Sequence, residues 1–174
     1  LMLAKIREIV IISSPNYLND FQRLLGDGSD LGLRLHYLTQ KKPNGIAEAF
    51  IIAENYIKDS NVCLILGDNI FYGAHFRNKL NKAKKRKKGA TMFCYHVNDP
   101  SRFGVVEFDS KKKVISIEEK PEQPKSNFVI TGLYFYDNNV VKIAKSLKPS
   151  KRNELEITDI NKYYLNLENL YVEN

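Results

Sequence analysis

The 174-residue sequence contains no tryptophan, only two cysteines and only two methionines. Cys63 and Cys94 each lie in an apolar, strand-like run and lack metal-type spacing, which argues against a zinc site. We interpret both as reduced core residues of a cytoplasmic protein, although the count alone allows one disulfide. No apolar run is long enough to span a bilayer and no secretory signal is visible at the start, so we expect no membrane partner.

Acidic residues are absent between Arg77 and Lys88, a segment with eight basic side chains. The whole chain has a formal net charge of +7, and without this segment it is nearly neutral. A basic helix on a neutral body is usually a solvated face, and this one has no interleaved aromatic residues to stack on bases. We therefore expect no nucleic-acid partner. The alternative, a polyanion-binding patch, would show salt-sensitive binding.

The chain is organised around the stretch Val62–Asn69, in which five apolar residues are followed by Gly67, Asp68 and Asn69. An uninterrupted apolar run predicts a strand that is buried on both faces of a parallel sheet. A carboxylate directly after such a strand lies in the crevice where open α/β sheets bind their ligands. Asp68 is therefore a candidate metal or phosphate-site residue, and the alternative is a simple turn aspartate.

Strand and helix patterns alternate in the first part of the chain. We predict strands over residues 9–12, 33–37 and 62–66, with helices over residues 19–25 and 46–57 between them. This order is typical of a doubly wound parallel sheet with right-handed crossovers. Residues 1–6 have a helical composition but no N-cap, and the chain does not begin with Met, so we expect a piece of a longer protein.

After Asp68 the pattern changes to mostly strands. Strand patterns cover residues 90–97, 105–108, 113–120 and 128–136, and a hairpin turn is expected at residues 109–111. Helices are predicted over residues 139–147 and 157–167, and a last strand starting at Leu170 has no evident partner. We predict one α/β domain over residues 1–174, with a doubly wound, mixed and mostly parallel sheet.

Seven segments, in order, resemble one family. They are residues 24–29 (LLGDGS), 67–73 (GDNIFYG), 95–100 (YHVNDP), 103–108 (FGVVEF), 118–121 (EEKP), 131–137 (TGLYFYD) and 154–161 (ELEITDIN). Their order and spacing resemble the glucose-1-phosphate thymidylyltransferases of the sugar-phosphate nucleotidyltransferase family, over the whole chain. The resemblance implies a Rossmann-like nucleotidyltransferase fold. It also implies Mg²⁺-dependent synthesis of dTDP-glucose and pyrophosphate from dTTP and glucose 1-phosphate, for dTDP-rhamnose and polysaccharide biosynthesis.

The resemblance also implies segments that this sequence does not contain. The family has a Gly-rich loop that wraps the triphosphate, on a strand between those predicted here at Ile9 and Val62. It has a second metal-binding aspartate in a Trp-Leu-Asp-Thr-Gly stretch. We therefore expect a nucleotidyltransferase domain that is incomplete at both ends, with unpaired strand edges, and that folds poorly and is inactive by itself. For the full-length protein the resemblance implies a homotetramer.

The resemblance assigns the catalytic and metal residues individually. Asp68 matches the first of two carboxylates that hold Mg²⁺, an ion that binds phosphate oxygens with one or two carboxylates. Lys120 and Arg152 match the catalytic residues that hold the sugar phosphate, and the guanidinium fork suits a phosphate. Pro121 favours an extended backbone at Lys120. Without the resemblance, both basic residues would pass for solvated surface charges.

The sugar pocket is assigned in the same way. Glu119 matches a glutamate that accepts hydrogen bonds from sugar hydroxyls, and Gly104 matches a backbone position that the sugar approaches closely. Ile130 and Tyr134 match pocket residues and, independently, share one face of a strand; plain core packing is the alternative. Glu119 and Lys120 have opposite parity, so we expect a bulge or twist at the strand end.

Gln40 and Gly45 match the loop that reads thymine. Glutamine can donate and accept hydrogen bonds at once, and glycine lets the backbone approach the base. Without the resemblance, neither residue would be informative. Two alternatives to the thymidylyltransferase stay open: a sister enzyme that uses UTP, CTP or GTP, and a non-catalytic protein that retains a sugar-nucleotide site.

Overall fold

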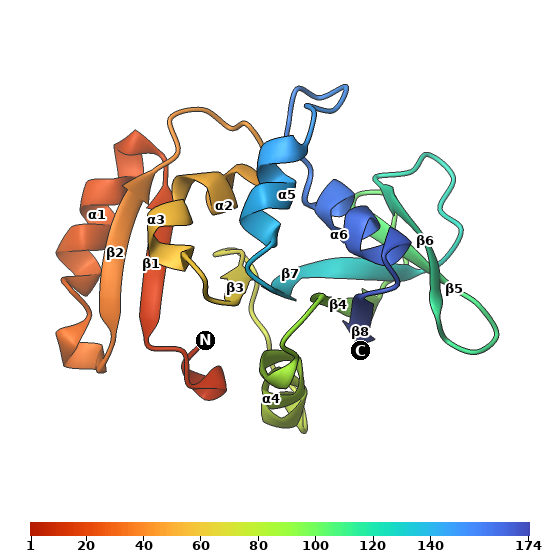
Figure 1. The fold of residues 1–174 in the computed structure, drawn as a ribbon, viewed down its shortest axis with the longest axis horizontal. Coiled ribbons are helices and arrows are strands. Elements are labelled where there is room, and N and C mark those ends of the chain that lie inside the picture. Colours follow the sequence, from red (N-terminus) through yellow and green to blue (C-terminus); the bar gives the residue numbers. More distant parts are fainter.

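Eight strands and six α-helices follow one another along residues 1–174, all of which the computed structural model describes (Figure 1). The strands are β1 (Glu8–Ser13), β2 (Arg34–Thr39), β3 (Val62–Ile65), β4 (Ala90–His96), β5 (Gly104–Phe108), β6 (Val114–Glu119), β7 (Phe128–Tyr136) and β8 (Leu170–Glu173). The helices are α1 (Pro15–Leu25), α2 (Glu48–Ile52), α3 (Glu54–Ile57), α4 (Phe76–Lys85), α5 (Val140–Ser146) and α6 (Ile157–Asn166). Short 3₁₀ turns cover Met2–Ala4 and Ser29–Leu31.

The strands form two sheets. β1 and β2 pair in parallel, and the second sheet has the order β6-β5-β7-β4-β8 with β3 also paired to β7. In the second sheet, β7 runs antiparallel to β3, β4 and β5, β5 is antiparallel to β6, and only β4 and β8 are parallel. The predicted α/β class and mixed sheet are confirmed. The prediction of a mostly parallel sheet is wrong, because the long strand β7 runs against three neighbours.

Strand β3 differs from its prediction. It is antiparallel to β7, with Val62 opposite Tyr136, and its four residues are partly exposed rather than buried on both faces. β1 pairs only with β2 and β3 only with β7, so each keeps one free edge. A groove of about 380 Å³, lined mostly by apolar side chains, lies between these two strands. The expectation that the strands at Ile9 and Val62 lack a ladder partner on one edge is confirmed.

Several local predictions are corrected by the structure. The single helix expected over residues 46–57 is split into α2 and α3, because Ala53 departs from helical geometry with φ −90° and ψ 8°. α1 begins at Pro15 rather than near Asn19, since the fixed φ of proline suits the first helical position. Residues 2–4 form a 3₁₀ turn instead of a helix. β8 does have a partner, as Leu170 lies opposite Ala90 of β4.

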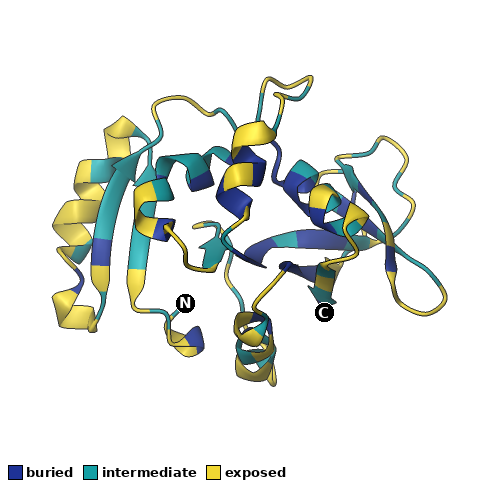
Figure 2. Cartoon of the chain, in the orientation of Figure 1, coloured by how far each residue is buried: buried dark blue, intermediate teal, exposed yellow.

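The core is built on both faces of β7. Ile130, Tyr134 and Tyr136 belong to the larger apolar cluster, together with residues of α2, α5 and α6. Leu133 and Phe135 point to a smaller cluster with residues of α4. Figure 1 shows α5 and α6 on one side of β7 and α4 on the other, and Figure 2 shows that burial is concentrated there. Helix α1 contributes no buried residue.

Buried hydrogen bonds tie β7 to α6. The Tyr136 hydroxyl donates to Asn161 Oδ1 at 2.7 Å, and the Tyr164 hydroxyl donates to Asp137 Oδ1 at 2.6 Å. Asp137 Oδ2 accepts from the Gly89 N–H at 2.7 Å. Burial raises the pKa of both tyrosines, so their hydroxyls remain donors at neutral pH. These bonds give hydrogen-bond partners to buried polar groups that water cannot reach.

The basic segment is partly engaged within the chain. Arg86 Nη2 lies 2.8 Å and Lys82 Nζ 3.0 Å from Glu173 Oε1 of β8, and Lys84 Nζ donates to the Ala4 carbonyl at 2.9 Å. Several of its charges therefore anchor α4 to neighbouring elements.

Both cysteines are free, as predicted. Cys94 is buried, Cys63 is partly buried, and burial raises the pKa of the Cys94 thiol to about 12. None of the helices combines the length and the apolar character that crossing a membrane requires.

Candidate active site

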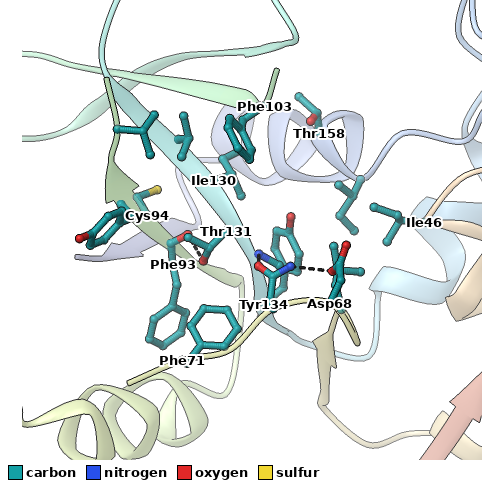
Figure 3. A pocket seen from close by; sticks show the side chains of 18 of the residues that line it. Ile46, Asp68, Phe71, Phe93, Cys94, Phe103, Ile130, Thr131, Tyr134 and Thr158 are labelled. Atoms are coloured by element: carbon teal, nitrogen blue, oxygen red, sulfur yellow. Dashed lines mark hydrogen bonds between the residues drawn. The ribbon is translucent and has the colours of Figure 1, made fainter. Parts of the chain in front are cut away.

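A cavity of about 930 Å³ lies where β4, β5, β6 and β7 meet the turn after β3 and the loop before α6 (Figure 3). Its wall contains most residues proposed from the sequence: Asp68, Gly104, Glu119, Lys120, Ile130, Tyr134 and Arg152. Gln40 and Gly45 do not line it, although the next residue, Ile46, does. The fold thus brings together residues from widely separated parts of the chain, and it places the loop expected to read the base outside the cavity wall.

Asp68 lies on an exposed turn after β3, where Asn69 holds it. Asn69 Nδ2 donates to Asp68 Oδ1 at 2.7 Å, and Asn69 Oδ1 accepts from the Gly132 N–H of β7 at 2.9 Å (Figure 3). Leu66 packs there so closely that a Cβ at position 132 would lie 2.7 Å from its Cγ. Asn69 was not predicted from the sequence as a functional residue, and its position beside Asp68 was the only signal.

The oxygen atoms at this turn would fit a magnesium ion that takes its other ligands from water or from phosphate oxygens. No group of three or more His, Cys, Asp or Glu side chains is placed to hold a metal by itself. Asp68 Oδ1 accepts the Asn69 bond, and Oδ2 accepts no hydrogen bond from the chain. One hard carboxylate oxygen suits Mg²⁺, which usually binds one or two carboxylates and keeps several waters.

Lys120 follows the last residue of β6 and has a left-handed backbone, with φ +42°. The extended conformation predicted from Pro121 is therefore wrong. The Lys120 N–H donates to the Phe103 carbonyl at 3.0 Å and holds the residue there against a cost of about 1–2 kcal/mol. This change of direction lets Glu119 and Lys120 both face the cavity, which agrees with the predicted twist at the strand end.

The Glu119 carboxylate is held by the Thr158 hydroxyl, in space that Gly104 leaves open. The Thr158 hydroxyl donates to Glu119 Oε2, and Gly104 lies opposite Glu119 in the β5–β6 ladder. A Cβ at position 104 would lie 3.3 Å from both Thr158 Oγ1 and Ile130 Cδ1. Glycine therefore leaves room for this cluster. Thr158 was missed as a functional residue because its role depends on a contact between distant segments.

The Arg152 guanidinium lies among three carboxylates. Its Nε and Nη2 donate to the two oxygens of Glu156 at 3.2 and 2.8 Å, and Nη2 also lies 3.2 Å from Glu154 and 3.5 Å from Glu119. Glu156 is buried and also accepts from the Ser150 hydroxyl at 2.6 Å. The hydrogen bond to Glu156 is the main reason that the pKa of Arg152 is raised. The two-point pairing fixes the orientation of the guanidinium.

Ile130 and Tyr134 line the cavity from the same face of β7, as predicted (Figure 3). Both are also buried members of the larger core cluster, so the same two residues pack the core and line the cavity. Burial, with a contribution from the negative charge of Glu119, raises the pKa of Tyr134. Its hydroxyl is therefore a neutral group beside the charged side chains.

The family model described as Nucleotidyl transferase matches residues 1–174, the whole chain. The chain belongs to the nucleotidyl transferase family. The recognition based on seven sequence segments is thereby confirmed at the level of the family.

Individual family members are similar to this chain over most of its length. A glucose-1-phosphate thymidylyltransferase of Neisseria gonorrhoeae is 59% identical over 165 residues, which are 95% of this chain and 57% of that protein. A glucose-1-phosphate thymidylyltransferase of Xanthomonas campestris pv. campestris is 50% identical over 173 residues, which are 99% of this chain and 59% of that protein. The chain thus spans less than three fifths of the length of these relatives.

Solved structures share the fold of this chain. A crystal structure described as a glucose-1-phosphate thymidylyltransferase from Bacillus anthracis, in complex with a sucrose, matches with a TM-score of 0.91 and 40% identity. It covers 99% of this chain and 70% of that chain. A UDP-glucose pyrophosphorylase complexed with UDP-glucose matches with a TM-score of 0.76 at 20% identity, which bears on the fold alone. The predicted nucleotidyltransferase fold is confirmed.

Proposed function

We propose that the full-length protein containing this chain is a Mg²⁺-dependent glucose-1-phosphate thymidylyltransferase. It joins glucose 1-phosphate to the thymidylyl group of dTTP and releases pyrophosphate, for the synthesis of dTDP-sugars. The observation that carries the proposal is that Asp68, Lys120 and Arg152, from three separate segments, line one cavity. The names of relatives at 50–59% identity support the choice of substrates.

The proposed reaction is an in-line displacement. An oxygen of the sugar phosphate forms a bond to the α-phosphorus of dTTP, the bond from that phosphorus to the bridging oxygen breaks, and pyrophosphate leaves with the electron pair. Phosphate monoesters have a second pKa of about 6, so the nucleophile is already anionic at neutral pH. The residues therefore need not remove a proton; they bring two anions together and neutralise them.

Arg152 and Lys120 are proposed to hold the sugar phosphate. Arg152 is directed by its pairing with Glu156, and its Nη1 makes none of the contacts to the three carboxylates. Glu119, oriented by Thr158, is placed to accept hydrogen bonds from sugar hydroxyls. Ile130 and Tyr134 form an apolar and neutral wall beside them.

Asp68 is proposed to hold Mg²⁺ together with the triphosphate. Bound there, the ion would supply charge neutralisation of the phosphate oxygens. Asn69 keeps the carboxylate anchored to β7, so its remaining oxygen has a fixed position relative to the cavity.

Gln40 and Gly45 are proposed to contact the base at the rim of the cavity. Gln40 Nε2 donates to Glu48 Oε2 at 2.7 Å and to the Gly45 carbonyl at 3.1 Å. Because a carboxylate can only accept, this arrangement leaves Gln40 Oε1 to accept from a base N–H, such as N3–H of thymine.

We further infer that the full-length protein is a cytoplasmic enzyme and a homotetramer. Light scattering on the full-length protein would check the tetramer.

The decisive test is Asp68→Asn in the full-length protein. We expect Mg²⁺-dependent pyrophosphorolysis of dTDP-glucose to fall at least about a thousandfold, because the neutral amide cannot hold the ion in place of the carboxylate. Asp59→Asn is the control, because Asp59 is exposed and makes no side-chain hydrogen bond or ion pair. Near-normal turnover of the Asp68 variant would remove this residue from the site, and competition by UTP, CTP and GTP would measure base preference.

Residues 1–174 assayed by themselves should be inactive. The family resemblance places a triphosphate-binding loop and a second metal carboxylate in segments that this sequence does not contain. The measurement is pyrophosphate release from dTTP and glucose 1-phosphate, with the full-length protein as the positive control. Turnover by the 174-residue polypeptide would contradict the proposal that catalysis requires those two segments.

A further inference from the structure

The loop before α2 and the loop before α6 are joined through their backbones. The Leu155 N–H donates to the Asn44 carbonyl at 2.6 Å, and the Ala47 N–H donates to the Leu155 carbonyl at 3.2 Å. One residue thus donates and accepts across two segments that lie more than a hundred positions apart in the sequence. We refer to this contact, made by Leu155 with residues 44–47, as the loop bridge.

Gly45 makes the loop bridge possible. Its φ is +103°, and a Cβ at this position would lie 2.4 Å from the Leu155 oxygen and 2.5 Å from the Leu155 nitrogen. Real Cβ atoms do not approach backbone atoms so closely, so any side chain would force one of the loops to move. The space that glycine provides here is filled by the backbone of Leu155, on the side of Gly45 that faces the other loop.

Each end of the loop bridge is connected to proposed substrate-binding groups. On one side, Gln40 donates to the Gly45 carbonyl, and Asn44 Nδ2 and Gln40 Nε2 both donate to Glu48. On the other side, Leu155 lies between the two glutamates, at 154 and 156, that contact Arg152. A displacement at either loop is therefore transmitted to the other through two backbone hydrogen bonds and one close contact.

We propose that the loop bridge couples the nucleotide and sugar-phosphate half-sites, with Gly45 and Leu155 as positioning residues. This inference rests on the proposed function. Occupation of the Gln40–Gly45 loop holds the Arg152–Glu156 loop in its binding geometry, so dTTP raises the affinity for glucose 1-phosphate. By linkage, glucose 1-phosphate raises the affinity for dTTP by the same factor.

The test compares two glycine variants in the full-length protein. Gly45→Ala and Gly32→Ala both place a side chain at a left-handed position, but a Cβ at Gly32 (φ +64°) meets nothing within 4 Å. We expect Gly45→Ala to raise the KM for glucose 1-phosphate about tenfold, within the usual range of coupling between sites, and Gly32→Ala to leave it within about twofold. A Gly45→Ala variant that changes only the KM for dTTP, or neither constant, would overturn the coupling.

A measurement on the unsubstituted protein does not depend on whether Gly45→Ala folds. Added dTTP, without sugar phosphate, should slow hydrogen exchange at the Leu155 amide about fivefold or more. Slower exchange in residues 40–45 with no change at Leu155 would contradict the coupling alone. A full-length protein that makes no product from dTTP and glucose 1-phosphate would contradict the proposed function, and the coupling of its substrates with it.

Discussion

At Arg152, one guanidinium is shared among carboxylates that differ in burial. Glu156 is buried and pairs through two hydrogen bonds, whereas Glu154 and Glu119 are more exposed and lie farther from Nη2. Exposed ion pairs are weak, because water and side-chain entropy compete with them. A phosphate that enters the cavity is thus expected to displace the two weaker partners and to leave the pairing with Glu156 in place.

Glu156→Gln should therefore weaken sugar-phosphate binding. The amide cannot accept two bonds from the guanidinium, so Arg152 loses its fixed direction, and we expect the KM for glucose 1-phosphate to rise about tenfold, or roughly 1.4 kcal/mol. Steady-state kinetics with glucose 1-phosphate as the varied substrate measures this. Glu154→Gln is the matched control, and its KM should be unchanged or lower, because a competitor of the phosphate is removed. Equal increases in both variants would contradict this division.

Cys94 should be inert as a nucleophile in the folded protein. Burial raises its pKa to about 12, so at pH 8 the thiolate is present at roughly one part in ten thousand. In the Cys63→Ser background, iodoacetamide should leave the native protein unlabelled for hours and label it within minutes in denaturant. Rapid labelling under native conditions would show that the strand β4 opens.

Several residues that line the cavity could be predicted from the sequence, and residues that hold them in place could not. Asp68 and Lys120 lie in recognisable segments, Arg152 lies two residues before one, and all three line the cavity. Asn69 and Thr158 act by hydrogen bonds to Gly132 and Glu119, and these contacts exist only after folding. The left-handed backbone of Lys120 was also unpredictable, because a bond to Phe103 overrides the local effect of Pro121.

At the scale of elements, the attachment of α6 to β7 depends on a buried polar contact. Asn161 is fully buried, its Oδ1 accepts from Tyr136, and its Nδ2 has no partner. Tyr136→Phe would leave that oxygen unpaired as well, and an unpaired buried group costs about 1–3 kcal/mol. We expect the free energy of unfolding of the full-length protein to fall by about this amount in urea titrations.

Tyr163→Phe is the control for this prediction. Tyr163 is next to Tyr164 on α6 and 45% exposed, and its hydroxyl makes no hydrogen bond within the chain. Its loss should change the free energy of unfolding by less than about 0.5 kcal/mol. A similar loss of stability in both variants would mean that the Tyr136–Asn161 bond contributes little.

The positions of the strands could be predicted, and their pairing could not. Apolar runs located every strand from β1 to β8, because burial of one or both faces imposes that pattern locally. The direction of pairing depends on which strand lies alongside, as for β3, which is antiparallel to β7 although it follows a helix. The break at Ala53 had no signal either, since alanine favours helix.

At the scale of the whole molecule, the α/β class and the nucleotidyl transferase fold followed from the sequence, and the division into two sheets became evident only in space. β1 and β3 face each other across the groove, each with one unpaired edge, and Ile9, Val10 and Leu64 are among its lining residues. Unpaired backbone donors and acceptors beside apolar side chains favour the addition of another strand.

A polypeptide of residues 1–174 should therefore assemble with itself, because strands from neighbouring copies can pair with the unpaired edges of β1 and β3. Light scattering should rise steeply with its concentration, and the assembled material should gain β structure in circular dichroism. Val10→Lys places a charge in the groove and should suppress the growth, whereas Leu3→Lys, on an exposed turn outside the groove, should not. Equal assembly of both variants would mean that the chains associate through another part of the surface.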